Sequence, residues 1–164
     1  MLDHSYLLSE SCGSDVLRDV EMTRQYIDAA QFVFYDLREV ARQLATLALF
    51  AEFRLTPCTG DHPLMFMAEQ RFSVAREQSG SLRPSFLGAH HHRHLVLAIE
   101  RFGDAITLLR KMRPSVGHCG AALSMLRSAW QEMMQTSRAL PGFDTIDVSQ
   151  SCCGCMDLHR INPA

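Results

Sequence analysis

The sequence predicts an all-α fold, an antiparallel four-helix bundle followed by an irregular tail that contains cysteine and histidine. Two observations carry this prediction. Apolar residues recur with helical periodicity in four segments, and proline or glycine marks the short connections between them. We expect residues 1–13 to be loose, residues 14–140 to form one helical domain, and residues 141–164 to form the tail. No strand pattern of useful length interrupts the helical segments.

The first helical segment is a run of 43 residues, Ser14 to Thr56, without glycine or proline. A second apolar row lies beside its main stripe and widens the face that we expect to be buried. The main stripe is Ile27, Ala30, Phe34, Leu37, Ala41, Leu44, Ala48, Ala51 and Leu55, extended backwards by Val20 and Val16, and the second row is Tyr26, Val33, Val40 and Leu47. Ser14 or Asp15 is the expected N-cap. One helix of this length would span about 65 Å, so a break or kink near residues 24–28, which would give five helices, is the alternative.

Three shorter helices are expected after the turn at residues 56–61. The second begins after Asp61 as N-cap, with Pro63 in its first turn. The third covers residues 90–112 and the fourth residues 115–138, and prolines follow both. Their inward faces are Met65, Ala68, Phe72 and Ala75 in the second, Leu95, Ile99, Phe102, Ile106 and Leu109 in the third, and Ala122, Leu126, Ala129 and Met133 in the fourth.

Composition is that of an ordinary globular domain, with 47% hydrophobic residues and a net charge of −2. This charge gives no general attraction to nucleic acid, and we predict no nucleic-acid partner. The N-terminus lacks the basic start and the following apolar run of a signal peptide. No stretch approaches the roughly 18 apolar residues of a transmembrane segment. We therefore expect an intracellular, cytoplasmic protein. Its six cysteines would then be free thiols or metal ligands rather than disulfides.

The strongest candidate site is the cluster of cysteines in the tail. Cys152 and Cys155 have the C-x-x-C spacing that allows two thiolates to bind one zinc ion, and His159 would be a third ligand. No second half of a zinc finger is adjacent, so a fourth ligand would have to come from Cys153, Cys12 or the histidine cluster. The same thiolates would also suit an iron–sulfur cluster, a redox pair or acylation, and the alternative is a tail without a specific role.

A second candidate is the histidine cluster at the start of the third helix. His90 and His94 lie one helical turn apart and would chelate Zn²⁺, Ni²⁺ or Cu²⁺. His92 falls on the apolar stripe, three residues before Leu95. The alternative is a solvated polar start of a helix.

A third, weaker candidate depends on the bundle topology. An up-down-up-down bundle brings its first and third connections to one end, which would unite Cys58, His62, His118 and Cys119 as a Cys₂His₂ set. The remaining cysteines and histidines would all lie at the opposite end. Burial of Cys119 as a structural residue is the alternative.

The motifs of familiar enzymes are missing: we find no H-E-x-x-H, no E-x-x-H pairs, no phosphate-binding loop and no G-x-S-x-G. We therefore predict no catalytic residues and favour a non-enzymatic regulatory or assembly module. It would act on a protein partner or as a homo-oligomer, with bound zinc as an option. The first alternative is a zinc- or iron-binding sensor or structural protein. The second is an enzyme, or a binder of haem or another small molecule, with His92 or His118 in a cavity.

Overall fold

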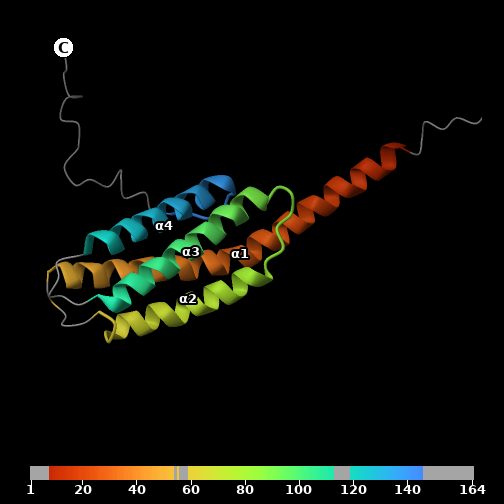
Figure 1. Cartoon of the computed structure of the whole chain (residues 1–164). Helices are drawn as coiled ribbons and strands as arrows, with labels where there is room; N and C mark the ends of the chain where they lie inside the picture. The colour runs from red at the N-terminus through yellow and green to blue at the C-terminus, as the bar shows by residue number, and fades with distance from the viewer. Residues whose placement is uncertain (1–7, 54, 56–58, 113–118, 146–164) are drawn as a thin grey trace, which may run out of the picture.

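The computed structural model describes residues 8–53, 55, 59–112 and 119–145. In these ranges the protein contains four helices and no strand: α1 (Leu8–Glu52), α2 (Pro63–Ser81), α3 (Ala89–Lys111) and α4 (Cys119–Ala139). The predicted all-α four-helix bundle is confirmed. The starts of α2 and α4 lie at one end of the bundle, and the α2–α3 connection lies at the other (Figure 1).

Helix α1 is a single continuous helix of 45 residues, and its first turns extend beyond the other three helices (Figure 1). The alternative of a break near residues 24–28, and with it the five-helix arrangement, is therefore wrong. The helix also begins at Leu8, before the predicted N-cap at Ser14 or Asp15, and ends at Glu52, before Thr56. Contacts with the α2–α3 connection and with α3 support α1 at this position, where Thr23 and Tyr26 are both buried.

The hydrophobic core lies between the four helices, and the second apolar row of α1 is buried in it over its whole length. Tyr26, Val33, Val40 and Leu47 are each at most 3% exposed. The predicted inward faces of α3 and α4 are buried, as are those of α2 except Phe72, which packs at the edge of the core. These buried rows confirm the helical periodicity read from the sequence.

The two ends of the main α1 stripe do not join the core. Val16 is 60% exposed and Val20 is 55% exposed, because α1 has left the other helices there. Leu55 is 69% exposed, since α1 ends before it. The expectation that the stripe is buried over its whole length is thus wrong at both ends.

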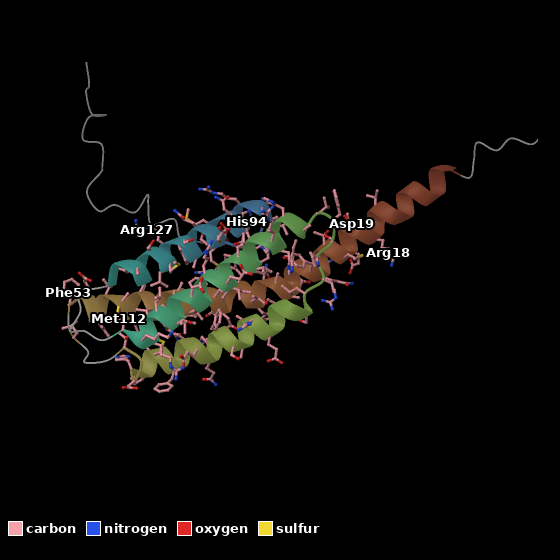
Figure 2. The ribbon with its side chains drawn as sticks, in the orientation of Figure 1. Arg18, Asp19, Phe53, His94, Met112 and Arg127 are labelled. Carbon is pink, nitrogen blue, oxygen red and sulfur yellow. The ribbon has the colours of Figure 1, made fainter. Side chains whose placement is uncertain are left out.

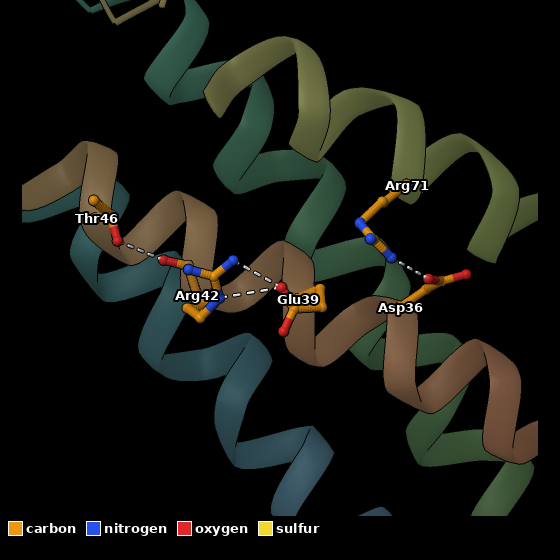
Figure 3. Close-up of polar contacts among 5 residues, drawn as sticks. All are labelled: Asp36, Glu39, Arg42, Thr46 and Arg71. Atoms are coloured by element: carbon orange, nitrogen blue, oxygen red, sulfur yellow. Dashed lines mark hydrogen bonds and ion pairs between the residues drawn. The ribbon is translucent and has the colours of Figure 1, made fainter. Parts of the chain in front are cut away.

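The most extensive helix contacts are those of α3 with α4 and of α1 with α2. Among the described residues, one ion pair joins α1 to α2: Arg71 Nη1 lies 2.9 Å from Asp36 Oδ1 (Figure 3). Figure 3 also shows two hydrogen bonds within α1: Arg42 donates to Glu39, and the Thr46 hydroxyl donates to the Arg42 carbonyl. These exposed contacts add little stability compared with the core.

After α4 the chain turns at Gly142, whose φ of 90° favours glycine, and runs back along α1. Phe143 is buried, and its ring meets Phe34 edge-on at 5.3 Å. Arg38 Nη1 donates to the carbonyl of Asp144 at 3.1 Å. The start of the predicted irregular tail is thus irregular, but it contributes one aromatic side chain to the core.

Candidate functional site at the histidine end of the bundle

The α2–α3 connection is fastened to α1 by a chain of buried hydroxyl groups. The Thr23 hydroxyl donates to the Asp19 carbonyl at 2.7 Å, as threonines inside helices often do. Thr23 Oγ1 therefore accepts from the Ser85 hydroxyl at 2.6 Å, and Ser85 Oγ in turn accepts from the Gly88 N–H at 3.1 Å. Among the side chains of α1 that the structure describes, Thr23 is thus the first one that is buried against another part of the protein.

His91 is the central side chain of this end. It is completely buried, its Nδ1 lies 2.8 Å from the Tyr26 hydroxyl, and its ring packs on Phe143 with ring centres 4.1 Å apart. Its Nε2 is buried without a hydrogen-bond partner among the described residues. Burial, followed by the nearby His92 and His94, lowers the pKa of His91 to about 4, so the imidazole is neutral at neutral pH. Burial also raises the pKa of the Tyr26 phenol.

His92 lies beside this pair and is half-buried. Its ring meets Tyr26 edge-on with ring centres 5.9 Å apart, and burial lowers its pKa. Its Nδ1 is buried and has no hydrogen-bond partner in the described part of the chain. The sequence pattern placed His92 on the apolar stripe, but the structure places His91 at its centre, with His92 at the margin.

His90 and His94 form a separate pair on the side of α3 that faces α4. Their ring centres are 4.7 Å apart, and the rings are nearly perpendicular. His94 Nδ1 also lies 2.6 Å from Glu132 Oε2 on α4. Figure 2 shows His94 between these two helices. The predicted chelating pair is thus brought together, and Glu132 is an additional residue that the sequence did not indicate.

Most of the other predicted metal ligands lie outside the described residues. These are Cys152, Cys153, Cys155 and His159 of the tail, together with Cys58 and His118. Cys119 begins α4. Within the ranges that the structure describes, no group of three or more histidine, cysteine, aspartate or glutamate side chains is arranged to hold a metal ion.

His62 is described and acts as a helix cap. Its Nδ1 accepts a hydrogen bond from the Leu64 N–H at 3.2 Å, so His62 is the N-cap of α2 in place of the predicted Asp61. Pro63 follows at the first helical position, as expected. The role of His62 seen here is structural, and the proposed Cys₂His₂ set stays a prediction.

A different surface feature lies on the N-terminal part of α1. Arg18 and Asp19 mark the point at which α1 leaves the other helices (Figure 2). The neighbouring apolar side chains Val16, Leu17 and Val20 are 60%, 73% and 55% exposed. In the α2–α3 connection beside Thr23, Phe86 is 87% exposed and Leu87 is 55% exposed. This end therefore carries large apolar side chains that no described part of the chain covers.

Comparison with known proteins gives no relative. No family model, no curated protein and no solved structure matches this chain. In the part of the chain that the structure describes, no helix has the length and apolar content needed to cross a membrane.

Proposed function

We propose that the protein is a helical assembly module that pairs with a second copy of itself through the N-terminal part of α1. We call residues 8–20 the projecting segment. The observation that carries the proposal is the exposure of Val16, Leu17 and Val20 on a helix that has left its own bundle. Fully burying one such side chain contributes about 1.5–3 kcal/mol, and contiguous exposed apolar surface of this kind commonly marks an interface.

The spacing of these side chains favours a helix as the covering element. Val16 and Val20 continue the three-and-four spacing that Ile27, Ala30 and Phe34 use inside the bundle. That spacing packs best against another helix, whose side chains fill the gaps between successive turns. A helix laid along the projecting segment would therefore extend the packing of the bundle itself.

A second copy supplies such a helix with a matching length. The projecting segment is about 20 Å long at 1.5 Å per residue. If the projecting segments of two copies pair antiparallel, the first residues of each segment lie against the point where the other leaves its bundle. Phe86 and Leu87 are exposed beside that point. The projecting segment and the α2–α3 connection then contribute about 20 residues from each copy, the size of a standard interface.

The test is the mass of the full-length protein in solution, measured by light scattering during size-exclusion chromatography. We expect about twice the chain mass of 18.5 kDa. The triple variant V16Q/L17Q/V20Q retains good helix-forming residues but loses the apolar surface, and we expect it to be a monomer with an intact bundle.

The double variant L49Q/F53Q is the matched control. Leu49 and Phe53 lie near the other end of α1 and are 54% and 69% exposed. We expect this variant to remain a dimer. A monomeric wild type, or a dimer that only the control substitutions dissociate, would refute the proposal.

A further inference from the structure

We propose that His90 and His94 bind one divalent transition-metal ion, with Glu132 as the residue that orients His94. The inference concerns a different chemistry from the proposed assembly and does not depend on it. It rests on the spacing of two imidazole rings and on one short contact between α3 and α4.

The distance between the two rings suits a shared ion. Zinc–nitrogen bonds are about 2.0–2.1 Å long, so each ring centre would lie about 3.2 Å from the ion. For nitrogen–metal–nitrogen angles between about 90° and 109°, the ring centres are then about 4.5–5.2 Å apart. The observed separation of 4.7 Å falls within this range. The separation of the two ring centres is therefore compatible with one shared ion.

Glu132 prepares His94 for such a role. The contact of 2.6 Å between its Oε2 and Nδ1 of His94 favours the tautomer in which Nδ1 carries the proton and donates it to the carboxylate. The lone pair then lies on Nε2, which has no hydrogen bond to any described residue. A carboxylate behind the imidazole is the usual second partner of a metal-binding histidine, and it fixes the orientation of the ring.

The ligand set selects the class of ion. Imidazole nitrogens suit Zn²⁺, Cu²⁺ and Ni²⁺, whereas Mg²⁺ and Ca²⁺ prefer oxygen ligands. Two protein nitrogens leave the remaining positions to water, so this is an open site rather than a closed structural one. Such a site agrees with the finding that no described group of three or more ligands surrounds a metal position.

The test uses Ni²⁺ as probe, titrated by calorimetry into full-length protein that carries no affinity tag. We expect one site per chain that depends on the histidine pair. His90→Ala and His94→Ala should each weaken binding at least tenfold. His90 is exposed, so its substitution leaves the fold intact and keeps the test valid if His94→Ala proves unstable.

Glu132 is tested by two substitutions. Glu132→Ala removes the acceptor and should weaken Ni²⁺ binding by about 10- to 100-fold. Glu132→Gln retains an acceptor oxygen, so its affinity for Ni²⁺ should be close to that of the wild type. If both substitutions weaken binding equally, or neither does, then the orienting role is wrong.

His159→Ala is the matched control, because it removes one histidine of the tail and leaves the pair intact. We expect it to bind Ni²⁺ at the histidine pair with the affinity of the wild type, and the same holds for the double variant C152S/C155S. Binding that is lost in the tail variants but retained in His90→Ala would overturn the proposal. Absence of saturable binding at about 1 mM Ni²⁺ would overturn it as well.

Discussion

At the scale of single residues, His91 couples the stability of the bundle to pH. An imidazole that is neutral and buried in the folded protein becomes exposed on unfolding, where its pKa returns to about 6.5. Between pH 6.5 and pH 4 the unfolded chain therefore binds a proton that the folded protein does not. The free energy of unfolding is unaffected by His91 above pH 6.5 and falls as the pH decreases from 6.5 to 4.

We predict that this effect is lost in His91→Gln, which retains a polar side chain beside Tyr26 but does not titrate. From pH 7 to pH 4 the wild type should lose roughly 3 kcal/mol more of its unfolding free energy than the variant does. Urea unfolding at several pH values measures both slopes. Equal slopes in the two proteins would show that His91 is not held neutral by burial.

The Tyr26 hydroxyl is the hydrogen-bond partner that His91 has in the core. Tyr26→Phe leaves Nδ1 of His91 buried without that partner, which should cost about 1–3 kcal/mol of unfolding free energy. Tyr35→Phe is the control, because Tyr35 lies on the same helix and is 59% exposed. Its substitution should change the unfolding free energy by less than about 0.5 kcal/mol. Similar costs for the two variants would contradict the role of the Tyr26 hydroxyl.

At the scale of elements, Gly88 stands at the junction between the α2–α3 connection and α3 and packs closely against Tyr26 of α1. A Cβ added at Gly88 would lie 2.9 Å from the ring of Tyr26, which is itself held by His91. Gly88 has a φ of −83°, a conformation that alanine adopts easily, so the obstacle is contact rather than backbone strain.

We therefore predict opposite signs for two glycine substitutions. Gly88→Ala should destabilise the protein by about 1–3 kcal/mol, because the ring must move. Gly80→Ala lies in the last turn of α2, where the new Cβ would meet no other part of the described protein within 4 Å, and it should stabilise the protein by up to about 1 kcal/mol. Thermal and urea unfolding report both effects. A Gly88→Ala protein as stable as the wild type would show that the Tyr26 ring leaves more room at Gly88 than the distance of 2.9 Å implies.

The helices were largely predictable because each one buries a face with clear periodicity. Leu95 and Phe102 in α3, like Val33 and Val40 in α1, are buried where the spacing placed them. The limits of α1 were not predictable, because periodicity shows which face is apolar but not how far the neighbouring helices extend. Val16 continues the stripe in sequence, yet it lies beyond any described partner.

The candidate site was predictable only in part, for a related reason. The spacing of His90 and His94 is local, so it can be read from the sequence, and the structure brings the two rings together. Glu132 lies 38 positions from His94, and Tyr26 lies 65 positions from His91. Partners so far apart are set by the packing of helices, and no local pattern identifies them. The choice between His91 and His92 as the buried histidine likewise depends on how α3 is rotated about its axis against the other helices.

At the scale of the whole molecule, the protein combines a packed bundle with a helical extension. An isolated helix as short as residues 8–20 is only marginally stable in water, because most helical stability comes from packing of its apolar face. We expect the extension to be stabilised by the second copy. The α2–α3 connection, with Phe86 and Leu87 exposed beside the base of α1, would be part of the same interface.

Hydrogen exchange of the backbone amides in residues 8–20, followed by mass spectrometry at two protein concentrations, tests this assembly most directly. If two copies pair through the projecting segment, these amides should be protected, and the protection should increase with concentration as the dimer forms. Protection of the α3 core around Phe102 should stay the same and serves as the internal reference. Rapid exchange of residues 8–20 that does not change with concentration would contradict the proposed assembly.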